Sequence, residues 1–159
     1  FFDFGLIKTI SKNFPNVIIN LIGPKDPLAV KEIQELTKFD NIKIEDKVNY
    51  KDLPEVMSSF SIGIIPLKQM EEVYQLSSAK FLQYLATGLP VVSVPFIEFS
   101  EFQKNVYFCK SNTEFLNSIK LLIDSKPDFN NKNINLEKFN WDRISIDARN
   151  SLKDLLKQN

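Results

Sequence analysis

The sequence predicts an α/β domain in which a parallel sheet carries helices on both faces. Short apolar runs rich in Val and Ile recur along the chain, and such runs suit strands buried on both sides of a sheet. Longer stretches between them space their apolar residues three or four apart, as helices do. The two kinds of segment alternate, which is typical of βαβ units.

The first third of the chain is expected to alternate helix and strand twice. Asp3 can cap a helix whose inward residues would be Phe4, Ile7, Ile10 and Phe14. Gly5 leaves a strand over residues 1–7 as the alternative, and Pro15-Asn16 ends either element. The next elements are a buried strand over 17–22, a helix over 28–39 that buries Val30, Ile33 and Leu36, and an edge strand over 42–48.

The middle of the chain continues the alternation. Asp52 and Leu53-Pro54 open a short helix to Phe60, and a buried strand over 61–65 is closed by Pro66. A loop over 67–76 leads to a helix that starts at Ser77. Gly88 stops this helix because glycine accepts the left-handed conformation of a C-cap, and the β-branched run 91–94 is the next strand.

The last third is expected to hold four elements and a polar loop. We expect an irregular or helical piece over 98–103, a strand over 106–109, and a helix over 113–125 capped by Asn112. Its inward residues would be Phe115, Ile119, Leu122 and Ile123. Residues 126–139 are polar and read as a loop or linker. Asn140 caps a final helix over 140–157 with an apolar stripe of Ile144, Ala148, Leu152 and Leu155.

Composition limits the possible functions. The 159 residues suit one domain, and 20 cationic against 20 anionic residues remove the electrostatic case for nucleic acid. The chain has no His and one Cys, so zinc sites built on these residues and internal disulfides are excluded. The single Cys fits a reducing cytoplasm. No apolar run approaches the roughly 18 residues that a membrane span needs.

The helix that starts at Ser77 carries the candidate site. Its unpaired N–H groups and dipole favour an anion, and Ser77, Ser78 and Lys80 add donors at that end. A diphosphate could bind there, with Gln83 one turn further on to reach sugar hydroxyls. The alternative is a surface helix with ordinary caps and a polar stripe of Lys80, Gln83, Tyr84 and Thr87.

Residues 80–92, KFLQYLATGLPVV, resemble the donor-binding segment of retaining glycosyltransferases with the GT-B fold, the glycogen-synthase-like superfamily or glycosyl transferases group 1. Members often read Lys-x-x-Glu-Tyr-x-Ala-x-Gly-x-Pro-Val-Val. The matching positions are Lys80, Tyr84, Ala86, Gly88, Pro90, Val91 and Val92. Gln83 replaces the Glu that binds ribose, and Gln75 stands at the family's other acidic position. Amides lose the charge-assisted strength of a carboxylate.

The resemblance extends along most of the chain, through the strand ending Ile-Gly-Pro24, Leu53-Pro54, the strand ending Ile-Ile-Pro66, and Trp141-Asp142. It implies a single Rossmann-like domain over 1–159, the C-terminal half of a GT-B enzyme. The family's central strand, its Arg/Lys pair for the donor phosphates and its N-terminal acceptor domain would precede Phe1, which we expect to be a cut site rather than a natural start.

The implied function is transfer of a sugar from a UDP- or GDP-sugar to a glycan, lipid or polysaccharide acceptor, with no cofactor, no metal and no catalytic residue in this chain. The expected donor-binding residues are Gly23, Tyr50, Gln75, Leu76, Ser77, Ser78, Lys80 and Gln83. Asn49 could replace Tyr50 at the base, and a packed aromatic is the alternative for Tyr50. Glu71 and Glu72 are expected to be solvated loop charges, with approach to the donor sugar as the alternative, and Cys109 is expected to be buried.

The expected partner is the acceptor domain of the same enzyme, without which this chain should be inactive. The full-length enzyme would be cytoplasmic, with peripheral membrane association as an option. Two alternatives stay open: a non-catalytic subunit that binds a sugar nucleotide or a partner, favoured by the two amides, and a sugar-nucleotide 2-epimerase, which the lack of His disfavours.

Overall fold

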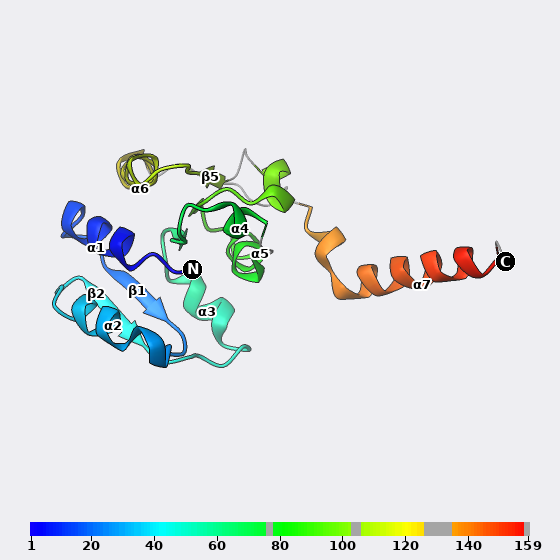
Figure 1. Ribbon diagram of the computed structural model, residues 1–159, viewed down its shortest axis with the longest axis horizontal. Helices are drawn as coiled ribbons and strands as arrows, with labels where there is room; N and C mark the ends of the chain where they lie inside the picture. Colours follow the sequence, from blue (N-terminus) through cyan, green and yellow to red (C-terminus); the bar gives the residue numbers. More distant parts are fainter. Residues whose placement is uncertain (76–77, 103–105, 126–134, 158–159) are drawn as a thin grey trace.

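The computed structural model describes residues 1–75, 78–102, 106–125 and 135–157 (Figure 1). The elements before the central motif are α1 (Phe4–Asn13), β1 (Ile19–Ile22), η1 (Pro27–Ala29), α2 (Val30–Leu36), β2 (Ile42–Glu45), α3 (Leu53–Ser58), β3 (Gly63–Ile65) and α4 (Glu71–Tyr74). The remaining ones are α5 (Ala79–Ala86), β4 (Val91–Ser93), η2 (Ile97–Phe102), β5 (Val106–Phe108), α6 (Asn112–Ser125), η4 (Glu137–Phe139) and α7 (Trp141–Lys157).

The described strands form two parallel sheets. β1 pairs with β2, with Ile19 opposite Ile42, while β4 lies between β3 and β5. All pairs are parallel, as predicted, but no described strand joins β1 to β3. The predicted sheet is therefore present as a two-stranded and a three-stranded part.

Helices cover both faces of the sheet that contains β4. Neighbouring residues of this strand point to opposite sides, so each contacts a different layer of helices. Val92 joins the core cluster that contains the buried residues of α1, α2 and α6. Val91 joins a second cluster with the buried residues of α4, α5 and η2. The two clusters confirm the layered α/β architecture.

A local cap begins α1, and a residue distant in the sequence holds its other end. The Asp3 carboxylate accepts a hydrogen bond from the Leu6 N–H at 2.8 Å, so the predicted cap is confirmed and the alternative strand over 1–7 is wrong. At the other end, the Asn41 side-chain amide lies 3.0 to 3.2 Å from the carbonyls of Ser11, Phe14 and Val17. Asn41, which the sequence marked only as a turn residue, thereby ties the end of α1 to the start of β2.

Three predicted details are wrong. Val30 was expected inside but is 50% exposed, because Asp26 caps the separate turn η1 and α2 begins only at Val30. The expected loop over 67–76 contains the short helix α4. The side chain that caps α6 belongs to Ser111, which accepts from the Glu114 N–H at 3.2 Å, and not to Asn112.

α7 confirms its predicted start, since the Asn140 side chain accepts from the Asp142 N–H at 2.9 Å. Figure 1 shows this helix extending away from the body of the domain. Residues 142–150 are all exposed, including Ile144 and Ala148 of the predicted stripe. The side chains of Leu152 and Leu155 lie outside the described part. None of the described helices is long and apolar enough to cross a membrane.

Candidate functional site

The loops that follow β1 and β2 are tied to each other. The Gly23 N–H donates to the Glu45 carbonyl at 3.2 Å, and Lys25 forms an ion pair with Asp46 at 3.0 Å. Gly23 has a φ of +154°, a conformation that strains other residues. Tyr50 in the second loop is 78% exposed, so the alternative of a packed aromatic is wrong. These loops are held together at the carboxyl ends of β1 and β2, where ligands of such sheets bind.

At the start of α5 the structure describes three of the predicted donor-binding residues, Ser78, Lys80 and Gln83. Ser78 is the N-cap residue in an extended conformation, and its side chain forms no capping bond with the helix. Lys80 in the first turn is exposed, and Gln83 is half-buried one turn later. Leu76 and Ser77 lie outside the described residues. Because Ser78 leaves the first N–H groups uncapped, this end retains its capacity to bind an anion.

The end of α5 is a Schellman turn. The Leu89 N–H donates to the Tyr84 carbonyl at 3.1 Å, and the Gly88 N–H donates to the Leu85 carbonyl at 3.0 Å. Gly88 has a φ of +79°, which confirms the predicted role of this glycine. The turn delivers the chain directly into Pro90 and β4, so the helix and the strand are fixed relative to each other.

Two members of the predicted polar stripe do not face solvent as expected. Tyr84 packs its ring against Gly63 of β3, and burial raises the pKa of its phenol. The Thr87 hydroxyl donates to the Tyr84 carbonyl at 3.0 Å and so belongs to the helix end. Lys80 is the exposed member of the stripe, and the Gln83 side chain is half-buried.

We expect Gly63→Ala to destabilise the protein by about 1–3 kcal/mol, because an overpacked core forces neighbours to move. A Cβ at position 63 would lie 2.7 Å from Cγ of Tyr84. The measurement is chemical unfolding of both forms. In a Tyr84→Leu background the same substitution should cost much less, and an equal cost in both backgrounds would disprove the contact.

Gln69 anchors the segment that carries Gln75. Its amide nitrogen donates to the Cys109 carbonyl at 3.0 Å, and its amide oxygen accepts from the Tyr74 hydroxyl at 2.8 Å. This links α4 to the carboxyl end of β5. Gln75 follows as the exposed C-cap of α4, so the network places it near the same sheet edge as the loop after β5. The sequence carried no signal for this network, because its partners are 40 residues apart.

Glu71 and Glu72 are exposed in the first turn of α4, which confirms that they are solvated.

The predicted burial of Cys109 is also confirmed, and burial raises the pKa of its thiol while the hydrogen bond with Ser118 opposes that change. The described residues contain no cluster of His, Cys, Asp and Glu that could hold a metal ion.

An aromatic cluster lies beneath α5. The ring of Phe81 stacks on Phe99 at a centroid distance of 4.3 Å and on Phe108 at 5.8 Å. Phe96 and Phe102 complete its surroundings, at 6.2 and 5.9 Å. All of these residues except Phe108 are buried. The cluster gives the helix that carries Lys80 and Gln83 a rigid base.

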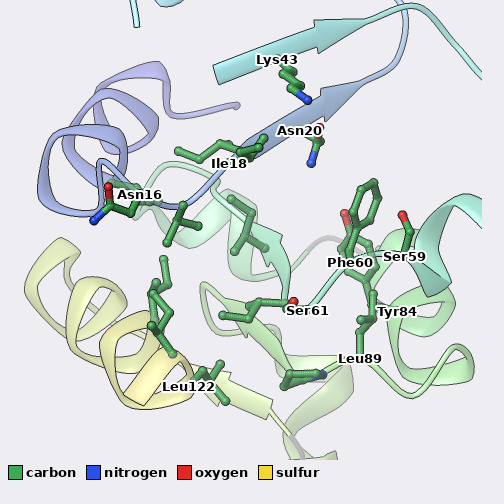
Figure 2. Close-up of a pocket in the computed structure, with 18 of the residues that line it drawn as sticks. Asn16, Ile18, Asn20, Lys43, Ser59, Phe60, Ser61, Tyr84, Leu89 and Leu122 are labelled. Carbon is green, nitrogen blue, oxygen red and sulfur yellow. The ribbon is translucent and has the colours of Figure 1, made fainter. Parts of the chain in front are cut away.

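A cavity of about 960 Å³ lies elsewhere, between the two sheets (Figure 2). Residues before and within β1 and β3, the loop before β4, and α6 line it; examples are Ile18, Asn20, Ile62, Leu89 and Leu122. In Figure 2, Asn20 projects from β1 while Phe60 and Tyr84 stand across the space. None of the predicted donor residues that the structure describes lines this cavity.

The family model for glycosyl transferases group 1 matches residues 5–125, more than half of the chain. The chain belongs to the glycosyl transferases group 1. This group 1 chain is also 29% identical over 102 residues to the putative teichuronic acid biosynthesis glycosyltransferase TuaH of Bacillus subtilis strain 168. The match covers 64% of this chain and 26% of TuaH, so the chain spans about a quarter of that relative's length. The resemblance of residues 80–92 to the group 1 segment is thereby confirmed at the level of the family.

Proposed function

We propose that this chain is the donor-binding domain of a glycosyltransferase that moves a sugar from a UDP- or GDP-sugar to a glycan, lipid or polysaccharide acceptor. The observation that carries the proposal is the start of α5. Lys80 stands in the first turn, where a cation opposes the helix dipole. Because a cation at this position does not stabilise the helix, a bound phosphate would explain why a lysine is there.

The proposed contacts with the sugar nucleotide would lie along the edge formed by the carboxyl ends of the strands. The N–H groups at the start of α5, with Ser77, Ser78 and Lys80, would stabilise the charge of the leaving diphosphate, an electrostatic contribution to catalysis. Gln83 would bind ribose hydroxyls, and Gln75 with Leu76 would lie near the donor sugar. Gly23 and Tyr50, on the tied loops after β1 and β2, would meet the nucleotide.

The proposed class of acceptor is supported by the relative TuaH. TuaH is described as a glycosyltransferase of teichuronic acid biosynthesis, which favours a polysaccharide acceptor for this chain as well. The acceptor domain would come from the rest of the full-length enzyme, and the isolated chain would not perform transfer because half a cleft neither excludes water nor aligns two reactants.

The two amides favour a second candidate, a subunit that binds a sugar nucleotide without turnover. A carboxylate accepts hydroxyl hydrogen bonds more strongly than the amides of Gln75 and Gln83 do. The third candidate, a 2-epimerase, would need the acids and His that such chemistry uses, and the chain has no His.

Product analysis of the full-length protein distinguishes the three candidate functions. Labelled UDP- and GDP-sugars are incubated with it and with candidate acceptors, and nucleotide release and the fate of the label are followed. We expect label in the acceptor. Binding without release would favour the non-catalytic subunit, an epimerised sugar nucleotide would favour the epimerase, and no binding would contradict the donor domain.

A further inference from the structure

We propose that Gln69 is a positioning residue for recognition of the donor sugar, because it holds Gln75 at the carboxyl edge of the sheet formed by β3, β4 and β5. The inference rests on the proposed function, in which Gln75 lies near that sugar. Gln69 lies outside the segment of residues 80–92 that resembles the family. Its effect is assigned to the sugar part of the donor and not to the nucleotide.

The segment after β3 is tied to the far strand of its sheet. β4 lies between β3 and β5, so these outer strands are roughly 10 Å apart. Gln69 comes shortly after β3, yet its amide nitrogen donates at 3.0 Å to the carbonyl of Cys109, directly beyond β5. The Cys109 N–H donates at 2.8 Å to the Ser93 carbonyl at the end of β4. Gln69 therefore braces the sheet at the edge where ligands of parallel sheets bind.

The Gln69 amide uses both of its polar atoms. The Cys109 carbonyl can only accept a hydrogen bond, so the amide nitrogen must face it. This orientation leaves the amide oxygen for the Tyr74 hydroxyl, which donates to it at 2.8 Å. Gln69 and Tyr74 are both half-buried, and a polar atom that loses its partner there is costly. The two bonds together favour one arrangement of α4 relative to β5.

α4 depends on this anchor because it is a single helical turn. Isolated helices of this length are unstable in water, and its N-cap residue Met70 forms no side-chain capping bond. Val73 is fully buried in the core cluster that also contains Phe81 of α5. One buried side chain fixes how deep the turn lies more than how it is rotated. The bond from the Tyr74 hydroxyl fixes the rotation, and with it the position of the next residue, Gln75.

Gln75 and Lys80 would contact different parts of the donor. Gln75 is exposed at the C-cap of α4, and its amide can both donate to and accept from sugar hydroxyls. Lys80 stands on α5, which is supported by the stacking of Phe81 on Phe99 and not by the Gln69 network. Loss of the network should therefore weaken the binding of the sugar and spare that of the diphosphate.

The test is the affinity of the full-length protein for UDP-glucose, UDP-N-acetylglucosamine and GDP-mannose, each compared with free UDP or GDP. Gln69→Met keeps the size of the side chain without its amide, and Tyr74→Phe keeps the ring without its hydroxyl. We expect both variants to weaken binding of the best-bound sugar nucleotide at least about fivefold, the usual effect of a lost hydrogen bond, and to change free-nucleotide affinity by less than about twofold.

Two further variants make this comparison reliable. Gln34→Met is the matched control, since Gln34 is an exposed residue of α2, and it should change neither affinity. Tyr74→Phe removes a single oxygen atom, so it tests the network even if Gln69→Met does not fold.

A combination with Gln75→Ala tests whether Gln69 acts through Gln75. Gln75→Ala alone should give a loss of similar size, and adding Gln69→Met should weaken sugar-nucleotide binding no further. Amide hydrogen exchange gives a second measurement. The N–H groups of Val73 and Gln75 close the turn of α4, and they should exchange at least about tenfold faster in Gln69→Met and Tyr74→Phe.

Three results would overturn the inference and leave the proposed function standing. Equal losses for the sugar nucleotide and the free nucleotide, or no loss of either, would show that Gln69 only supports the fold. Additive losses in the double variant would show that it does not act through Gln75. Binding of UDP or GDP without any of the three sugar nucleotides would contradict a sugar site at Gln75. If the wild type binds none of the five compounds, the proposed donor site is itself wrong, and the inference is overturned with it.

Discussion

Replacing Phe81 by alanine is expected to lower the free energy of unfolding by about 3–5 kcal/mol, the usual cost of removing a large aromatic side chain from a core. The Phe81 side chain is fully buried and contacts four other phenylalanine rings. Its removal would leave a space that this rigid group of rings cannot fill. For a chain of this size the melting temperature should fall by about 6–20 °C.

The matched control is Phe1→Ala, which removes the same atoms from a residue that is 65% exposed. It should change stability by about 0.5 kcal/mol or less. Chemical unfolding of the three proteins, fitted with a common slope, provides the comparison. Similar losses for both variants would show that the aromatic cluster does not carry the stability assigned to it.

Replacing Lys80 by alanine is expected to weaken the binding of UDP or GDP at least about tenfold, the usual effect of losing one charged contact with a phosphate. Stability should be unchanged or slightly higher, because a cation in the first turn opposes the helix dipole. Titration calorimetry measures the affinity, and thermal unfolding of the free proteins measures the stability.

Lys12→Ala is the control, since Lys12 is also exposed and helical but lies in the last turn of α1. It should leave nucleotide affinity unchanged. The affinity of the wild type should also fall more steeply with added salt than that of Lys80→Ala, as expected for a lost charge contact. Equal affinity of Lys80→Ala and the wild type would remove Lys80 from the site.

The sequence predicted the elements whose ends depend on local chemistry. The Asp3 cap, the turn at Gly88 and the cap at Asn140 involve residues within a few positions of one another, and all three are confirmed. α4 was missed because its neighbour Gln69 is held by a carbonyl 40 residues away, which no local pattern reveals.

The candidate site was predicted only in part, because local patterns do not show which side chains pack against residues distant in the sequence. Helical spacing correctly placed Lys80 and Gln83 on one side of α5. It could not show that Tyr84, on that side too, is directed at Gly63, because only the packing of α5 on β3 brings that glycine beside the ring. Likewise, the exposure of Val30 follows from the separate turn η1, after which α2 begins only at Val30, and apolar periodicity does not reveal that break.

Cys109 gives the protein a built-in reporter of local opening. Its thiol is 1% exposed, lies beside Ser118 of α6, and is the single thiol of the whole chain. We expect a thiol-specific reagent to reach it when α6 separates from the end of β5, and the raised pKa further slows reaction of the closed form. The rate of labelling therefore follows the frequency of that separation, without any engineered probe.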